Sequence, residues 1–92
     1  MNLKLTSIVS RSSDPVWANM DNEVVMMSVQ QSRYFGLDDI GSRIWLLMSE
    51  PISVTELHKH LMEEYEVDNK TCETDLLSLL GSLADQNLIE VN

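Results

Sequence analysis

The sequence predicts an α+β domain in which a three-stranded antiparallel β-meander is followed by three α-helices. The prediction rests on a change in the spacing of apolar residues near residue 38. Before that position apolar residues alternate or form short runs, as in strands, and after it they recur every three or four residues, as in helices. Because 92 residues provide for one hydrophobic core, we expect a single domain over residues 1–92.

Three apolar segments, residues 16–20, 23–29 and 33–37, form the predicted meander. Asp21 and Asn22 tolerate positive φ and suit a two-residue turn between the first two strands. The middle strand, EVVMMSV, is apolar on both faces, so we expect both faces of the sheet to be covered, at least in part. The preceding residues, 1–15, form either an N-terminal arm or a short strand.

Residues 38–92 form the helical part. Asp38 or Asp39 suits the N-cap of the first helix, and Pro51 ends it because the residue before a proline avoids the α region. The second helix begins at the sequence SVTE, in which Ser53 caps the helix and Glu56 completes a capping box.

The third helix is predicted over residues 72–86, with Asp68 as a cap before it and Asn87 as a C-terminal cap. A short extended piece, residues 88–91, ends the domain. A β-meander followed by three helices resembles a winged helix-turn-helix in its helical part.

The charge balance is strongly acidic. Fifteen Asp and Glu face six Lys and Arg, which gives a net charge of −9. Nucleic acid is therefore repelled, and a basic peptide or protein surface is attracted. The alternative is that the excess acid only keeps a small protein soluble. One cysteine forms no intrachain disulfide, and no stretch approaches the ~20 apolar residues of a membrane span, so we expect a cytoplasmic protein without a membrane partner.

Catalytic groups do not converge in this sequence. His58 and His60 point about 160° apart on a helix, so they do not share a metal ion. Cys72 lies in the apolar stripe of the third helix, where it is a core residue rather than a nucleophile. The three glycines are isolated and form no phosphate-binding loop. We therefore expect no enzyme activity, no metal and no cofactor.

Two classes of function remain. A winged-helix regulator would read DNA with its third helix, but this helix contains no Lys or Arg and carries Glu73, Asp75 and Asp85. A peptide-binding or protein–protein interaction module fits better, because the strand over residues 33–37 lies at a margin of the sheet and a helix runs beside it. An extended peptide can add a strand there. Gly36 either lets that peptide approach closely or only permits the turn into the helix.

The pattern YFGLD followed by GSRIW, with the hydrophobic strand before it, resembles the PqqD-like family of leader-peptide recognition elements. The resemblance extends over residues 16–91 and is greatest to the standalone members of lasso-peptide clusters. One departure is Asp38-Asp39, where many relatives have Asn followed by a small residue or proline. It affects the helix cap rather than the groove.

The resemblance implies a non-catalytic peptide chaperone. It would bind the leader of a ribosomally made precursor peptide as an added strand between residues 33–37 and the third helix. It would then deliver the precursor to a cysteine-protease-like leader peptidase and to an ATP-dependent, asparagine-synthetase-like cyclase.

The candidate peptide-binding residues come from the strand and from the third helix: Arg33, Tyr34, Phe35, Gly36, Leu37, Asp75, Leu76, Leu79 and Leu80. Alternation along a strand places Tyr34 on the opposite face from Phe35 and Leu37. The sequence leaves open which face lines the groove. It also leaves open whether Leu76 and Leu80 contact a peptide or belong to the core.

Overall fold

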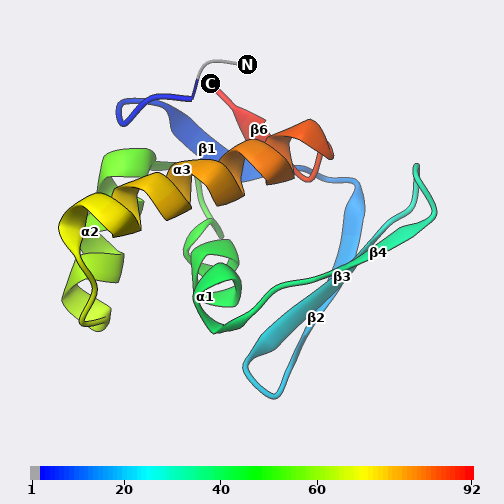
Figure 1. Ribbon diagram of the computed structural model, residues 1–92. Coiled ribbons are helices and arrows are strands. Elements are labelled where there is room, and N and C mark those ends of the chain that lie inside the picture. Colours follow the sequence, from blue (N-terminus) through cyan, green and yellow to red (C-terminus); the bar gives the residue numbers. More distant parts are fainter. Residues whose placement is uncertain (1–2) are drawn as a thin grey trace.

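The computed structural model describes residues 3–92, and this part of the chain contains two small sheets and three helices (Figure 1). In chain order the elements are β1 (Ile8–Arg11), β2 (Pro15–Met20), β3 (Glu23–Ser28), β4 (Arg33–Gly36), α1 (Asp39–Leu47), β5 (Ile52–Ser53), α2 (Val54–Glu64), α3 (Asn69–Asp85) and β6 (Ile89–Val91). The predicted α+β class and the order of meander before helices are confirmed.

The meander is an antiparallel sheet of order β2-β3-β4. Met26 of β3 pairs with Trp17 of β2 and Phe35 of β4, so these three side chains share the inner face. Asp21 and Asn22 have φ of 51° and 68°, as the predicted two-residue turn requires. β4 has a paired neighbour on one side only and is an edge strand.

A second sheet, of order β5-β1-β6, joins the two ends of the chain. Val9 of β1 is fully buried and pairs with Ile52 on one side and Val91 on the other. Within the segment 1–15, residues 8–11 therefore form the short strand rather than a loose arm. The sequence did not predict the sheet as a whole, because β5 has two residues and is too short to show a period.

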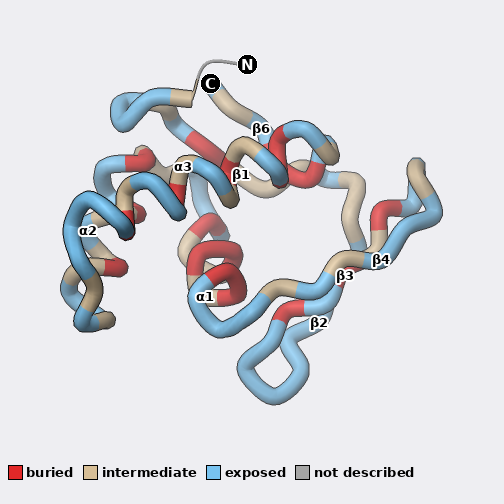
Figure 2. The backbone as a smooth tube through the Cα atoms, viewed as in Figure 1, coloured by how far each residue is buried: buried red, intermediate tan, exposed pale blue. Residues whose placement is uncertain are grey.

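The prediction that both faces of the meander are covered is wrong. Val24 and Met26 are buried on the inner face, but Val16 and Tyr34 on the outer face are 63% and 76% exposed. In Figure 1 the three helices lie to one side of the meander, and Figure 2 shows its strands only partly buried. The helices thus supply cover for the inner face alone.

The predicted N-caps of the three helices are present, whereas the C-cap of α3 is Gln86, and Asn87, predicted as the C-terminal cap, follows it with a φ of 60°. Asp38, Ser53 and Asp68 accept hydrogen bonds from the backbone N–H three residues further on. The bond from Thr71 N–H lowers the pKa of Asp68. Because Asp68 is the N-cap, α3 begins at Asn69, three residues before the predicted start at Cys72. The core beneath the helices contains chiefly Ile44, Trp45, Met48, Leu57, Leu76 and Leu80.

Trp45 belongs to this core. It is fully buried, and its ring meets that of Trp17 edge-on at a centroid distance of 6.1 Å. The Arg11 guanidinium lies 4.7 Å from the Trp17 ring and 5.4 Å from the Trp45 ring. It also donates to the carbonyl oxygens of Trp45 and Leu46 near the end of α1, where a positive charge is favoured. Partial burial lowers the pKa of Arg11.

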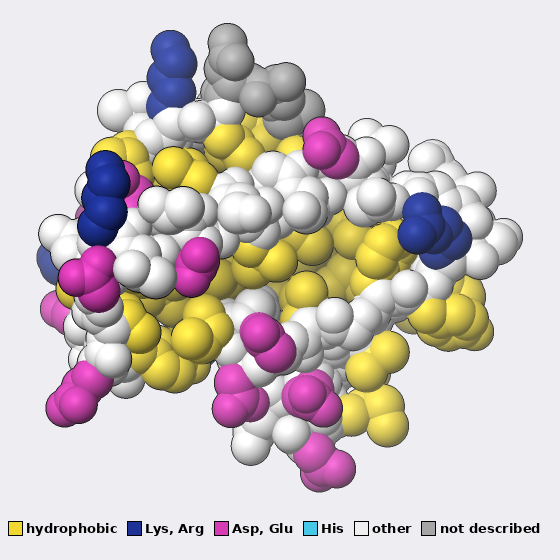
Figure 3. Space-filling model, in the orientation of Figure 1, with side chains coloured by type: hydrophobic (Ala, Val, Ile, Leu, Met, Phe, Trp, Pro, Cys, Tyr) yellow, Lys and Arg dark blue, Asp and Glu magenta, His cyan; other side chains and the backbone are white. Residues whose placement is uncertain are grey.

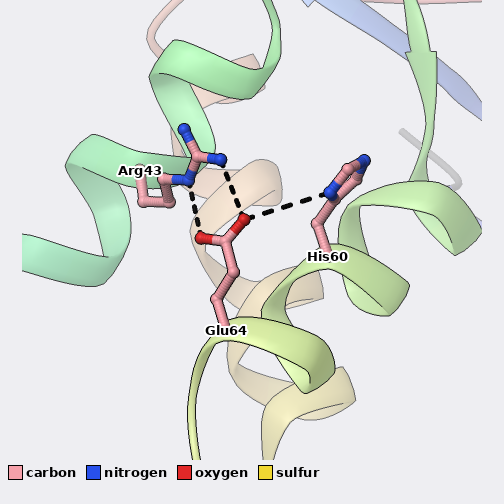
Figure 4. Close-up of polar contacts among 3 residues, drawn as sticks. All are labelled: Arg43, His60 and Glu64. Carbon is pink, nitrogen blue, oxygen red and sulfur yellow. Dashed lines mark hydrogen bonds and ion pairs between the residues drawn. The ribbon is translucent and has the colours of Figure 1, made fainter.

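An ion pair joins α1 to α2 (Figure 4). Arg43 donates from Nε and Nη2 to the two carboxylate oxygens of Glu64, at 2.7 and 2.8 Å. These hydrogen bonds lower the pKa of Glu64 and raise that of Arg43. His60 Nδ1 lies 4.0 Å from the same carboxylate. The pair connects α1 to the last residue of α2.

Candidate peptide-binding site

The free edge of β4 exposes backbone groups at two positions. Leu37 N–H donates to the carbonyl oxygen of Val24 at 2.9 Å, so Leu37 and, by alternation, Phe35 turn their backbone groups toward β3. Tyr34 and Gly36 lie between these positions. Their N–H and C=O groups therefore point away from β3, toward the open edge. A peptide that pairs with β4 would bond to these two residues.

A sharp corner connects the end of β4 at Gly36 to the start of α1 at Asp39. Asp38 is the N-cap, and its Oδ1 accepts from Gly41 N–H at 2.8 Å. A Cβ on residue 41 would lie 3.1 Å from that oxygen and 3.4 Å from Leu37 Cβ, so the close approach at the corner favours glycine there. Gly36 differs, since a Cβ at this position would meet no described atom within 4 Å and its φ is not positive. The turn into the helix therefore does not explain Gly36.

The side chains of β4 divide between the two faces of the sheet. Phe35 and Leu37 are half-buried and pack against the core on the side of the helices. Tyr34 pairs with Met27 on the outer face and is 76% exposed. The inner residues Phe35 and Leu37 are therefore placed to line a groove, and the side chain of Tyr34 is not.

The four candidates on α3 also divide. Leu76 and Leu80 are 2% and 0% exposed and belong to the core. Asp75 and Leu79 remain accessible and line a cavity of about 300 Å³ between α1, α2 and α3. Cys72 forms part of its wall, and burial, together with the nearby charge of Asp75, raises the pKa of this thiol.

A hollow separates α3 from β3 and β4. Figure 3 shows apolar atoms gathered in this hollow, with α3 above it and the strands below. At one end Arg33 reaches α3, because its Nη1 donates to Gln86 Oε1 at 3.4 Å while its guanidinium lies 5.5 Å from the Phe35 ring. Gln31 donates to the Gln86 carbonyl oxygen beside it. These contacts tie the β3–β4 turn to the end of α3.

The sequence did not single out Gln31 and Gln86 as part of this site. Surface glutamines carry no periodic signal, and the bond between Gln31 and Gln86 joins positions 55 residues apart.

The sequence also did not predict the cavity, because it forms only where three helices meet. Its residues Asp38 and Asp75 add carboxylates to an apolar lining that includes Ile40, which is 39% exposed. The site therefore suits a peptide with apolar and basic side chains.

Residues 3–92 contain no group of three or more His, Cys, Asp or Glu placed to hold a metal ion. Among the same residues, no helix has both the length and the apolar character needed to cross a bilayer.

The chain belongs to the PqqD family. The family model described as "Coenzyme PQQ synthesis protein D (PqqD)" matches residues 23–89, which is more than half of the chain. This result confirms the resemblance that the motifs around residues 34–45 indicate. No curated protein matches the chain.

Two solved structures are similar to it over nearly their full length. The first is "TbiB1 in Complex with the TbiA(beta) Leader Peptide", with 42% identity, a TM-score of 0.82, and coverage of 88% of this chain and 94% of that chain. The second is "Lasso peptide synthetase B1 complexed with the leader peptide", with 22% identity, a TM-score of 0.78, and coverage of 89% and 96%. The likeness to the second structure supports the fold.

Proposed function

We propose that this chain is a non-catalytic chaperone that binds the leader of a ribosomally made precursor peptide of the lasso type. The observation that carries the proposal is the open edge of β4 beside an apolar hollow and α3. The similar protein TbiB1 is described in complex with a leader peptide, and its 42% identity to this chain supports a common role.

The leader adds an antiparallel or parallel strand to β4. Backbone groups of Tyr34 and Gly36 hold it, and the inner side chains Phe35 and Leu37 contact alternate leader residues. Leu79 contributes from α3. Asp75 attracts a basic leader residue, although an exposed ion pair contributes only ~0–1 kcal/mol. Gly36 lets the leader backbone approach without a side chain beside it.

The chaperone acts in the cytoplasm and delivers the precursor to two enzymes. A cysteine-protease-like leader peptidase removes the leader, and an ATP-dependent, asparagine-synthetase-like cyclase closes the ring. This chain supplies recognition, and its partners supply the chemistry. It uses no cofactor.

Hydrogen exchange with and without a leader peptide tests the strand addition. Binding should protect the amides of Tyr34 and Gly36, whose N–H groups gain partners, and should change Phe35 and Leu37 little because these amides already face β3. N-methylation of a leader amide that points toward β4 should weaken binding, because it removes a hydrogen bond and adds a clash. Methylation of the next amide, which points away, is the matched control.

Protection confined to α3, with Tyr34 and Gly36 unchanged, would contradict strand addition and favour a helix bound in the groove. Equal effects of the two methylated leaders would contradict it as well. A leader that fails to bind the wild-type chain at all would reject the chaperone role.

A further inference from the structure

Arg33 is an exposed cation at one end of the apolar hollow, and the fold does not match its charge. None of the ion pairs within residues 3–92 includes Arg33, although the chain carries fifteen Asp and Glu. The other two arginines act inside the fold, since Arg11 bonds to carbonyl oxygens near the end of α1 and Arg43 pairs with Glu64. The charge of Arg33 is therefore available to an anion from outside.

The guanidinium of Arg33 is nevertheless held in place. Arg33 pairs with the buried Ser28 and, by alternation, shares the inner face of the sheet with Phe35. It lies 5.5 Å from the Phe35 ring, and one N–H donates to Gln86 Oε1 at 3.4 Å, which is a long hydrogen bond. A guanidinium has five N–H donors in a rigid fork, so enough of them remain for a carboxylate. A cation positioned in this way loses little conformational freedom when it binds an anion.

Charges of opposite sign mark the two ends of the groove between β4 and α3. Gln86, the partner of Arg33, is the C-cap of α3. Asp75 lies about 16 Å back along the helix axis, and it lines the cavity together with Asp38, which directly follows β4 and Leu37. Figure 3 shows a basic side chain at the right end of the apolar hollow and acidic side chains toward its left end. The groove is therefore positive where β4 begins and negative where β4 leads into α1.

We propose that Arg33 is a specificity-determining residue, which binds a carboxylate side chain of the leader and fixes the leader's register on β4. This inference rests on the proposed function and adds to it the means by which one register is chosen. Strand pairing alone does not choose, because backbone groups are the same at every position. A slip by one residue turns every leader side chain to the opposite face, and a slip by two residues moves the carboxylate away from Arg33.

The spacing along β4 predicts where the charged leader residues lie. In a strand paired with β4, the leader residues opposite Arg33, Phe35 and Leu37 all project into the groove, because side chains alternate. The first and last of these positions are roughly four residues, or about 13 Å, apart. We expect the carboxylate opposite Arg33, an apolar side chain opposite Phe35, and a basic side chain near Asp38 and Asp75. In an antiparallel leader, the orientation that is more stable per residue, the basic residue precedes the acidic one.

A double-mutant cycle between Arg33 and the acidic residues of the leader tests the pair. The probe is the leader of the precursor peptide encoded near this chain, with variants in which each Asp or Glu in turn is replaced by its amide. One of these replacements should weaken binding to the wild-type chain by about fivefold to tenfold. The same replacement should change the affinity of Arg33→Gln by less than about twofold, because the pair is already broken. The remaining replacements should affect both proteins alike.

Charge reversal separates the ion pair from the packing of Arg33 against Phe35. Arg33→Glu should bind the natural leader more weakly than Arg33→Gln does, and a leader with Lys at the coupled position should restore at least about half of the lost binding free energy. Lys59→Gln, at an exposed position of α2, changes the net charge by the same amount as Arg33→Gln and is the matched control. It should alter leader affinity by less than about twofold. Circular dichroism and melting curves confirm that each variant is folded.

An Arg33→Gln variant that responds to every leader replacement as the wild-type chain does would overturn the inference and leave the chaperone role intact. A uniform loss of affinity in Arg33→Gln, without coupling to any acidic leader residue, would limit Arg33 to supporting the β3–β4 turn and overturn it too. A leader without Asp or Glu that binds tightly has the same consequence. Absence of leader binding to the wild-type chain would instead reject the proposed function.

Discussion

The Ser42 hydroxyl takes the place of a missing ladder bond between Val24 and Leu37. Its Oγ accepts from Val24 N–H at 2.7 Å and donates to the Leu37 carbonyl oxygen at 3.1 Å, while Leu37 N–H still bonds directly to Val24 at 2.9 Å. Ser42 lies in the first turn of α1 and is 2% exposed. The hydroxyl therefore bridges the two strands at the end of β4, where they lack one direct ladder bond, and it connects α1 to both of them.

Ser42→Ala should lower the free energy of unfolding by ~1–3 kcal/mol, because it leaves a buried donor and acceptor without a partner. Denaturant unfolding measures this loss. Leader affinity should also fall, since the angle between β4 and α1 is no longer fixed. Ser49→Ala, at an exposed serine beyond the end of α1, is the control and should change neither quantity. A Ser42→Ala variant as stable as wild type would show that the hydroxyl is dispensable for the corner.

A substitution at the start of the second helix should lower stability without changing leader affinity. Ser53 Oγ accepts from Glu56 N–H at 3.1 Å, so Ser53→Ala should cost ~0.5–2 kcal/mol of stability through the lost cap. Leader affinity, measured well below the melting temperature, should barely change because Ser53 does not border the groove. A large loss of affinity in the folded variant would mean that the binding surface extends to the start of α2.

Elements with a strong local signal could be predicted from the sequence, and contacts between distant segments could not. The period change, the turn at Asp21 and Asn22, and the caps Asp38 and Ser53 depend on neighbouring residues, and the structure bears them out. The second sheet depends on pairing between residues such as Val9 and Val91, which no local pattern reveals.

The candidate site also has a part that the sequence predicts and a part that depends on contacts between distant segments. The edge position of residues 33–37 followed from the meander, and alternation separated Tyr34 from Phe35. Which face lines the groove depends on where the helices pack, so the sequence left it open. On α3, Leu79 lines the cavity and Leu80 lies in the core. The spacing of apolar residues does not predict this difference, because both leucines belong to one broad apolar stripe.

The ion pair between Arg43 and Glu64 should make stability depend on pH in the acid range. The hydrogen bonds from Arg43 lower the pKa of Glu64, so the stabilisation is complete above the unfolded-state pKa and is lost as pH falls through the lowered folded-state value. Glu64→Gln should therefore reduce the unfolding free energy at pH ~7 by up to ~1 kcal/mol, the range of partly exposed pairs. Wild type and variant should converge at strongly acid pH.

Denaturant melts at neutral and acid pH measure this difference. Glu63→Gln removes an exposed neighbouring carboxylate and serves as the control for a change of net charge. A stability difference between wild type and Glu64→Gln that persists undiminished below the lowered pKa would contradict the electrostatic origin.

The acidic groups near the groove should speed association with a basic leader. Raising salt from about 50 to about 500 mM should slow association and leave dissociation nearly unchanged, because screening acts mainly on the encounter. Asp75→Asn, at the cavity, should slow association more than Asp85→Asn, near the far end of the same helix. Stopped-flow rates that do not respond to salt would assign the excess acid to solubility.

The two aromatic residues of β4, Tyr34 and Phe35, should differ in their effect on leader affinity. Phe35 pairs with Met26 and packs inward beside the hollow, whereas Tyr34 lies on the outer face of the meander, opposite the helices. Phe35→Leu, which shortens the groove wall with little loss of apolar character, should weaken leader binding by about tenfold. Tyr34→Leu keeps the backbone groups that bond to the leader and should change its affinity less than about threefold.

Isothermal titration of both variants with one leader peptide measures the comparison, and melting curves separate binding from stability. If the leader binds Phe35→Leu as tightly as wild type but no longer binds Tyr34→Leu, its side chains lie on the outer face of the meander, opposite the helices. The hollow beneath α3 would then not be the site that holds the leader side chains, and the groove assigned to the inner face of the meander would be wrong.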